Sequence, residues 1–225
     1  MPIVIFILIA GLIIAGIIFG ALTAKKRREE LSALAARLGL QFSAADDYGL
    51  AKRFEFLDAL AVGDNRYGCN ILSGQYQNHE VLIFDYHYET HSTDSKGNRQ
   101  TNHHYFSFFL LMLPRSFPEL RITKEGMLSK IAQAFGYDDI DFESAEFSRA
   151  FCVRAKDKRF AYDFCNAQMM EYLLANRDLS IEVERSALAL AFPSRLSAAE
   201  IETNLGRLLE IRSRLPEYLF RKVRL

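Results

Sequence analysis

The chain has 225 residues, 50% of them hydrophobic, and its 28 basic residues balance 28 acidic ones to give a formal net charge of zero. A nucleic-acid-binding protein normally shows a basic footprint, so this balance argues against a nucleic-acid partner. The length is sufficient for one domain with its own hydrophobic core beside a membrane segment.

The N-terminal stretch is the clearest signal in the sequence. Residues 2–24 read PIVIFILIAGLIIAGIIFGALTA and contain no charged side chain. About 20 apolar residues in a helix cross the hydrocarbon core of a bilayer, and a lone span has to be helical because lipid offers its backbone no hydrogen-bond partners. A cleaved signal peptide would have basic residues before a shorter apolar run and a small-residue cleavage site, whereas Leu22 stands two residues before Ala24. We therefore predict a retained transmembrane helix over residues 1–24, embedded in a lipid bilayer.

A cluster of basic residues follows the apolar stretch directly: Lys25, Lys26, Arg27 and Arg28. Lysine and arginine are retained on the cytoplasmic side of a membrane. The sequence thus predicts a single-pass protein of the inner (plasma) membrane with its N-terminus outside and its C-terminal domain in the cytoplasm. The cluster can also contact anionic lipid headgroups, although a topology signal alone is sufficient to explain it.

The apolar stretch also contains a motif for helix association. Gly16 and Gly20 form a G-x-x-x-G pair, and Gly11 and Ala15 form a second small pair at the same spacing. Small residues at this spacing let two membrane helices approach closely. Because such pairs also arise by chance in apolar helices, a homodimer through Gly16 and Gly20 stands beside a monomeric helix as a hypothesis.

Residues 25–39 are predicted to form a juxtamembrane helix that continues the first one. Its apolar residues recur at helical spacing, and Gly39 follows as a stop signal; the stripe consists of Leu31, Leu34, Ala35 and Leu38. We expect this stripe to dock on a domain formed by residues 40–225. That domain would begin with an extended piece at residues 40–42 and a short helix within residues 50–60.

A run of aromatic and β-branched residues predicts an antiparallel sheet. The segments 68–76, 80–90 and 103–113 have the composition of strands. A short polar turn, residues 77–79, joins the first two, and the polar segment 91–102 reads as a hairpin tip. The strands 80–90 and 103–113 are therefore expected to be antiparallel neighbours. Pro114 and Pro118 are expected to end the third strand, with a short strand following at residues 120–122.

The remaining chain predicts alternating helices and strands. Helices are expected at residues 124–135, 157–174 and 198–214, with a helical turn from Ser144 to Phe147 and a capping box of Ser197 and Glu200 opening the last helix. Strands are expected at residues 151–155 and in a second hairpin formed by residues 179–184 and 188–192. The fold class is therefore α+β, an antiparallel β-sheet covered by helices, after an N-terminal transmembrane helix.

One stretch of the domain resembles a known family. Residues 142–174, FESAEFSRAFCVRAKDKRFAYDFCNAQMMEYLL, carry an E-x-x-x-F-x-x-x-F start, a V-x-A-x-D centre and an M-M-x-x-L-L ending. This pattern, together with the segment GQYQNHEVLIFDYHYET, is similar to an uncharacterised family of bacterial single-pass membrane proteins, a domain of unknown function. The resemblance covers most of residues 30–220 in loose form. It implies a bacterial membrane location and an intact domain, and it implies no activity.

Histidines gather around the predicted hairpin tip: His87, His91, His103 and His104. Paired strands would bring His91 close to His103, and imidazole suits Zn²⁺, Cu²⁺ and Ni²⁺. No cysteine or glutamate stands at a standard zinc-site spacing beside them. Exposed polar residues at a hairpin end are the favoured interpretation, so no metal is assigned.

Three carboxylates form the other cluster with metal-binding chemistry. Asp139, Asp141 and Glu143 would share one face of an extended segment, and carboxylate oxygens bind Ca²⁺ or Mg²⁺. The solvent face of a strand with Ile140 and Phe142 turned inward explains the same pattern, so no metal is assigned here either.

The sequence assigns no catalytic residue and no cofactor. A G-x-S-x-G elbow, a P-loop and a G-x-G-x-x-G motif are all absent. Cys69, Cys152 and Cys165 are an odd number at irregular spacings, which fits reduced, buried thiols in a cytoplasmic domain. The basic C-terminal residues Arg221, Lys222 and Arg224 read as a solvated tail, or as a second contact with the anionic membrane surface.

Two functions remain open at this level. The leading one is a membrane-tethered cytoplasmic interaction module that binds a protein partner or lipid headgroups, because tethering raises the effective concentration near such partners. The alternative is a membrane-anchored metal-dependent or hydrolytic enzyme that uses the histidine or carboxylate cluster. A deep pocket holding two or more of these groups within about 3–4 Å of a common point would favour the enzyme.

Overall fold

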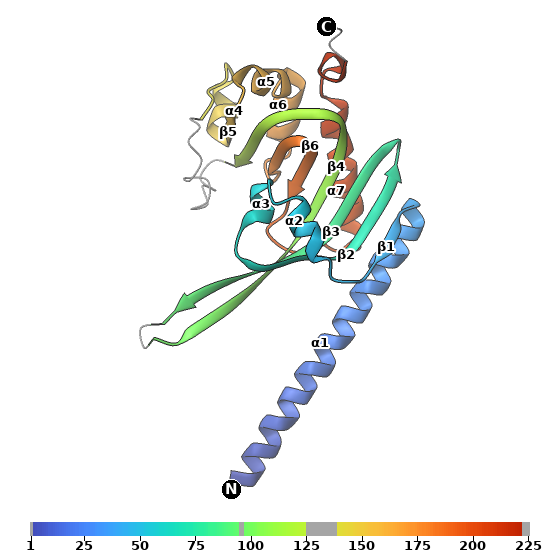
Figure 1. Cartoon of the computed structure of the whole chain (residues 1–225), viewed down its shortest axis with the longest axis vertical. Coiled ribbons are helices and arrows are strands. Elements are labelled where there is room, and N and C mark those ends of the chain that lie inside the picture. The colour runs from blue at the N-terminus through green and yellow to red at the C-terminus, as the bar shows by residue number, and fades with distance from the viewer. Residues whose placement is uncertain (1, 95–96, 125–138, 222–225) are drawn as a thin grey trace.

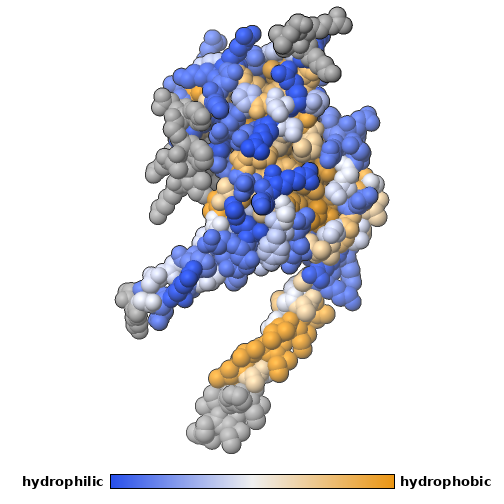
Figure 2. All heavy atoms as spheres, in the orientation of Figure 1, coloured by the Kyte–Doolittle hydropathy of each residue, from blue (hydrophilic) through white to orange (hydrophobic). Residues whose placement is uncertain are grey.

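The computed structural model describes residues 2–94, 97–124 and 139–221, with only the backbone of residues 2–8. Its first element is one unbroken helix, α1 (Pro2–Leu38), whose N-terminal part stands clear of the domain (Figure 1). The stretch Ile9–Leu38 meets the length and composition of a membrane span, and its apolar window is not buried against the domain. Figure 2 shows this free part as an apolar rod beside a mostly polar domain surface.

The C-terminal turns of α1 dock on the domain, as the apolar stripe predicted. Leu31, Leu34 and Ala35 are each only 1% exposed. The helix ends in a Schellman motif, in which the Leu40 N–H donates to the Ala35 carbonyl at 2.8 Å. Gly39 adopts φ +72° there, a conformation that glycine accepts without a Cβ penalty.

The sheet has six antiparallel strands: β1 (Gln41–Ser43), β2 (Asp64–Tyr76), β3 (His79–Thr93), β4 (Arg99–Lys124), β5 (Phe151–Ala155) and β6 (Ile181–Ala191). Strands β1 to β4 follow one another across the sheet. The long strand β4 is the organising element, because β6 pairs with one of its edges from Phe108 to Ile122. Its other edge pairs with β3 as far as Leu111 and with β5 from Leu120 onward.

Helices cover both faces of the sheet. The larger core lies between one face and the C-terminal part of α1, α5 (Lys158–Phe164), α6 (Ala167–Ala175) and α7 (Ala198–Ser213). The smaller core lies between the opposite face and α2 (Tyr48–Arg53) and α3 (Asp58–Ala61). Within the described residues, the chain also forms α4 (Ala145–Ala150) and the 3-10 helix η2 (Glu217–Phe220). Along β4, Phe109 and Leu111 face the larger core while Phe108 and Leu110 face the smaller one, as strand alternation requires.

The α+β fold class is therefore as the sequence predicts, and so are most of its elements. The predicted strands fall within β2, β3, β4 and β5, and the turn between β2 and β3 has positive φ at Gln77 and Asn78. Ser144 caps α4, and Ser197 and Glu200 form the expected capping box of α7. The predicted helix at residues 124–135 lies almost entirely outside the described residues.

Three sequence predictions were wrong in detail. Strand β4 continues through Pro114 and Pro118. On one edge of β4, both prolines lie where the register with β6 shifts; on the other edge, they lie between the segment that pairs with β3 and the segment that pairs with β5. Neither proline therefore removes a ladder hydrogen bond. The second hairpin is the single strand β6, in which Arg185 (φ +52°) pairs with Phe117 between two register shifts. The helix expected within residues 50–60 is two short helices, α2 and α3.

Strands β3 and β4 extend beyond the rest of the sheet as a two-stranded arm, which in the described residues comprises 90–94 and 97–102. The last pair between β2 and β3 is Asp64 with Glu89, whereas β3 and β4 stay paired as far as Thr93 and Arg99. The arm and the free part of α1 leave the domain on the same side (Figure 1). The polar surface of the arm in Figure 2 shows that it is not an extension of the core.

A charge cluster fastens α3 to the sheet. The Arg121 guanidinium forms ion pairs with Asp58 of α3, with Glu119 at 3.0 Å and with Glu182 of β6 at 3.4 Å. Burial raises the pKa of Glu182 to about 7, and Arg121 opposes that rise. A carboxyl whose pKa is raised in the folded state contributes stability below its unfolded pKa and loses it as pH rises through the folded pKa.

We therefore expect Glu182→Gln to change the pH dependence of folding. Relative to the parent chain, this variant gains stability as pH rises from about 4.5 to 7, by up to roughly 3 kcal/mol. Urea unfolding of the full chain in detergent, followed by circular dichroism at several pH values, measures the trend. Glu200→Gln is the contrast variant, because hydrogen bonds from Ser197 lower the pKa of Glu200. The stability of this variant relative to the parent chain should fall as pH rises through the acidic range. Parallel curves for the parent chain and Glu182→Gln would contradict the prediction.

Candidate functional site

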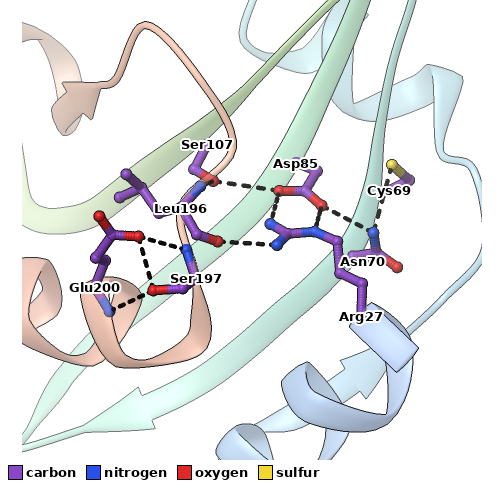
Figure 3. A network of polar contacts seen from close by, with 8 residues as sticks. All are labelled: Arg27, Cys69, Asn70, Asp85, Ser107, Leu196, Ser197 and Glu200. Carbon is purple, nitrogen blue, oxygen red and sulfur yellow. Dashed lines mark hydrogen bonds and ion pairs between the residues drawn. The ribbon is translucent and has the colours of Figure 1, made fainter. Parts of the chain in front are cut away.

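The junction between α1 and the sheet is held by a buried ion pair. Arg27, three residues beyond the predicted span, donates from Nε to Asp85 Oδ2 and from Nη2 to Asp85 Oδ1, both at 2.6 Å (Figure 3). Asp85 lies in the middle of β3 and is 1% exposed, and the Arg27 side chain is 18% exposed. Two parallel N–H···O bonds fix both the distance and the orientation of the partners.

Further hydrogen bonds complete this network (Figure 3). Asn70 Nδ2 of β2 donates to Asp85 at 2.9 Å, and Ser107 Oγ of β4 donates at 3.2 Å. Arg27 Nη1 donates to the Leu196 carbonyl at 2.9 Å, and the Leu196 N–H donates to Ser107 Oγ at 2.9 Å. The network therefore joins α1, three strands and the segment that leads into α7.

A local backbone irregularity brings Asn70 to this site. Asn70 has φ +50°, and the pairing of β2 with β3 shifts register between Cys69 and Leu72. A bulge of this kind re-aims a side chain that would otherwise follow the strand alternation. Asparagine tolerates the left-handed region better than most residues, so the residue type suits both its conformation and its hydrogen bond to Asp85.

The sequence analysis missed the role of Arg27. Lys25 and Lys26 behave as exposed surface residues and each lies 3.8 Å from a glutamate one helical turn later. Arg27 alone among the four basic residues reaches into the domain. A signal for this was present in the run VLIFDYHY, because Asp85 stands on the same strand face as the inward residues Val81 and Ile83 and so requires a buried cationic or donor partner.

The strand register sorts the histidines into two groups. His87, Glu89 and His103 share the sheet face that α1 packs on, whereas His104 stacks on Tyr88 on the opposite face. The sequence predicts His91 beside His103, but His91 pairs with Thr101 and His103 pairs with Glu89. The register thus places Glu89 beside His103, a neighbour that the spacing within one strand does not reveal.

Three side chains of that first group converge. His87 Nε2 lies 3.1 Å from His103 Nδ1, and His103 Nδ1 lies 3.5 Å from Glu89 Oε1. Burial lowers the pKa of His87, and its hydrogen bond to the Asn65 carbonyl partly opposes this. Among the described residues, this is the one group of three histidine, cysteine or acidic side chains whose ligand atoms all lie within 4.8 Å of one another.

The carboxylates at residues 139–143 do not form such a group in the described structure. The Asp139 carboxylate accepts the Val153 N–H at 2.7 Å, and the Ile140 N–H donates to the Val153 carbonyl at 2.8 Å. The segment is an irregular connection rather than a regular strand. Asp139 is thus used to hold this connection against β5, and Asp141 offers its backbone carbonyl to Tyr162.

The cysteines form no disulfide. Cys152 and Cys165 are buried and Cys69 is half-buried, which confirms the prediction of reduced thiols. Burial raises the pKa of Cys69 to about 11 and also raises that of Cys165, so neither is a ready thiolate at neutral pH. Of the basic C-terminal residues, Arg221 is exposed and its carbonyl accepts from Arg115, while Lys222 and Arg224 lie outside the described residues.

A cavity of about 470 Å³ lies beside α3, between β4 and residues 178–180 and 191–193. Its wall is mainly apolar, with His103, His104, Lys124 and Asp178 among the lining residues. His87 and Glu89 do not line it. Of the histidine group, His103 is therefore the one member that faces this cavity.

No protein-family model matches the chain, and no curated protein sequence matches it either. The fold does occur in a solved structure, the crystal structure of the mycobacterial trehalose monomycolate transport factor A. That structure superposes with a TM-score of 0.62 over 88% of this chain and 98% of the other, at 12% sequence identity. The likeness shows a shared fold, and the candidate membrane helix is consistent with membrane anchoring.

The Arg27–Asp85 pair gives an asymmetric prediction for stability. Arg27→Ala leaves the Asp85 carboxylate buried without a counter-charge and should destabilise the domain by about 3 kcal/mol. Asp85→Ala should cost less, because the partly exposed Arg27 can turn toward water. Arg28→Ala, at the exposed neighbouring position, is the control. Urea unfolding in detergent micelles, followed by circular dichroism, measures all three.

The paired replacement completes this test. Removing both charges with Arg27→Met and Asp85→Leu should recover most of the lost stability, because no buried charge then remains. An Arg27→Ala variant no less stable than Arg28→Ala would contradict the assigned role of the pair.

Proposed function

We propose that this chain is a single-pass membrane-tethered docking factor whose domain lies in the cytoplasm and presents its β-arm to a protein partner at the same membrane. The observation that carries this proposal is the Arg27–Asp85 network, which fixes the domain to the helix close to the end of the predicted span. A domain held in this way keeps a defined height and direction relative to the bilayer. The uncharacterised bacterial family that residues 142–174 resemble is consistent with such a location.

The attachment contains no flexible linker. Helix α1 runs without a break from the apolar stretch into the docked stripe of Leu31 and Leu34. A flexible tether would raise the local concentration of the domain alone, whereas a continuous helix also sets its orientation. This arrangement is suited to a partner that itself has a fixed orientation, such as an integral membrane protein.

The arm has the surface of a protein-binding element rather than of a lipid-binding one. Its exposed residues are mostly uncharged and polar, including Ser92, Thr93, Gln100 and Thr101. In the sequence, residues 90–102 contain two basic residues, Lys96 and Arg99, and one acidic residue, Asp94, whereas binding to anionic headgroups relies on larger clusters of basic residues. The protein partner is therefore favoured over lipid headgroups for this surface.

The shared fold supports an accessory role. The mycobacterial protein with this fold is titled a transport factor, and a similar fold in such a factor favours a binding function for this chain over an enzymatic one. We extend this to a partner class: a membrane protein of a transport system. The alternative of a membrane-anchored metal-dependent or hydrolytic enzyme rests on the histidine group, of which His103 lines the cavity beside α3 and His87 and Glu89 do not.

The orientation is tested by labelling single cysteines from one side of the membrane. In a bacterial host, Thr101→Cys in the arm should react with a membrane-impermeant maleimide only after the cells are lysed. Pro2→Cys should react in intact spheroplasts, because the N-terminus is placed outside. Labelling of Thr101→Cys in intact spheroplasts would contradict the proposed topology.

The docking surface is tested with a photoreactive amino acid in the full-length protein. A crosslinker at Thr101 should give a discrete product with one membrane protein, identified by mass spectrometry and verified by the reciprocal crosslink. Tyr162 on α5, which is 51% exposed, is the matched control position and should not give that product. Combining the Thr101 crosslinker with Arg27→Ala should weaken the product several-fold. Equal products at both positions, or crosslinks to lipid only, would overturn the assignment of the arm.

A further inference from the structure

The side chains of His87, Glu89 and His103 have the spacing of ligands around one small cation. His87 Nε2 and Glu89 Oε1 lie 3.1 Å and 3.5 Å from His103 Nδ1. Zinc binds nitrogen and oxygen ligands at about 2.0–2.1 Å in a tetrahedron, which places its ligand atoms about 3.3 Å apart. Two of the three separations therefore match tetrahedral spacing, and all three ligand atoms lie within 4.8 Å of one another.

We propose that His87 Nε2, His103 Nδ1 and a Glu89 carboxylate oxygen bind a divalent transition-metal ion, with Zn²⁺ as the expected occupant. Two imidazoles and a carboxylate are a zinc-binding set that leaves the fourth position open. Calcium and magnesium prefer oxygen ligands, so the two nitrogen donors select against them. The inference does not depend on the proposed docking function.

The outer contacts of the group support this assignment. Because a carbonyl can only accept, His87 Nδ1 carries the hydrogen and donates it in a hydrogen bond to the Asn65 carbonyl at 3.0 Å. Neutral His87 therefore turns the Nε2 lone pair toward His103 Nδ1, whose N–H it accepts at 3.1 Å when no ion is bound. A ligating histidine usually donates its other N–H to a carbonyl or carboxylate, which fixes its tautomer and ring orientation.

Asn65 also positions the carboxylate. Its side-chain Nδ2 donates to Glu89 Oε1 at 2.6 Å, so one residue orients two of the three proposed ligands. Asn65 has φ +47° and lies where the pairing of β2 with β3 shifts register between Asp64 and Tyr67. Bulges of this kind are over-represented beside functional sites. The strained backbone at Asn65 is what brings its carbonyl and its amide to the same group.

Aromatic packing holds the central ligand in place. The His87 ring lies between Tyr67, at a centroid distance of 4.5 Å, and Tyr105, at 4.7 Å. His87 is 1% exposed, whereas the His103 side chain is 55% exposed. The site is thus built on a fixed inner ligand and opens toward solvent, where water can occupy the fourth position. A bound ion would join β3 to β4 at the base of the arm.

The test uses the full-length chain in detergent, with no histidine tag and after removal of metal with a chelator. Equilibrium dialysis against Zn²⁺ should give about one ion per chain, and Co²⁺ should give the intense visible absorption of tetrahedral coordination. His103→Ala and Glu89→Gln should each weaken Zn²⁺ binding by more than about tenfold. Removing a residue that only supports a metal ligand already lowers metal affinity by about tenfold or more, and removing a ligand should cost at least as much. Zn²⁺ should raise the midpoint of thermal unfolding in the parent chain and not in His103→Ala.

His104→Ala is the matched control, because this neighbouring histidine lies on the opposite face of the same strand and bonds to Thr90. It should keep both the affinity and the Co²⁺ spectrum. Circular dichroism of each variant distinguishes the loss of a metal ligand from the loss of the fold. Because His103 is exposed, His103→Ala should leave the fold intact. Absence of stoichiometric Zn²⁺ binding by the parent chain, or equal losses in His103→Ala and His104→Ala, would overturn the proposal. The same holds for an octahedral Co²⁺ spectrum.

Discussion

The position of the domain relative to α1, the candidate membrane helix, depends on one buried charge. Asp85 lies in the centre of the sheet with 1% exposure, where an uncompensated carboxylate is costly. Its bidentate partner comes from α1, the one element that also carries the apolar span. A buried ion pair adds little net stability compared with apolar residues of the same shape. Its effect here is on specificity, because the helix can satisfy Asp85 only in one rotation and at one height.

The apolar contacts and the ion pair stabilise the attachment of α1 in different ways. Leu31, Leu34 and Ala35 bury their side chains against the larger core, and this burial supplies a driving force that has no direction of its own. The hydrogen bonds of Arg27 are directional and lie about one helical turn nearer the N-terminus. Two attachment points on a stiff helix fix an axis, whereas one would leave the domain free to swing. The arm inherits this fixed direction because it is an extension of β3, the strand that carries Asp85.

Local signals in the sequence predicted most of the elements, and the failures within the sheet share one physical cause. The stripe ending at Gly39, the capping box of Ser197 and Glu200 and the strand alternation of β3 depend on neighbours in the chain, and all three are present in the structure. Strand β4 continues through Pro114, and residues 181–191 form one strand. Both outcomes depend on how β4 pairs with β3 on one edge and with β6 on the other. A proline or a polar interruption looks like an end unless the partner strand is known. Register likewise decides that Glu89 and not His91 stands opposite His103, and no periodicity within one strand contains that information.

One face of β3 unites the three features that matter most for function. Every second residue from Val81 points to the α1 side, and the chemistry changes along this face from apolar, through the acid Asp85, to His87, Glu89 and His91. The order follows the depth of the strand, since the apolar residues lie in the core and the arm stands in solvent. Asp85 lies where the apolar part of this face ends, next to the turn of α1 that leaves the domain. Its cationic partner therefore comes from α1. The histidines fall just beyond, where β2 still covers one side at the Asn65 bulge and the other side is open. The Arg27–Asp85 pair, the histidine group and the arm therefore follow one another along β3 as this strand leaves the sheet.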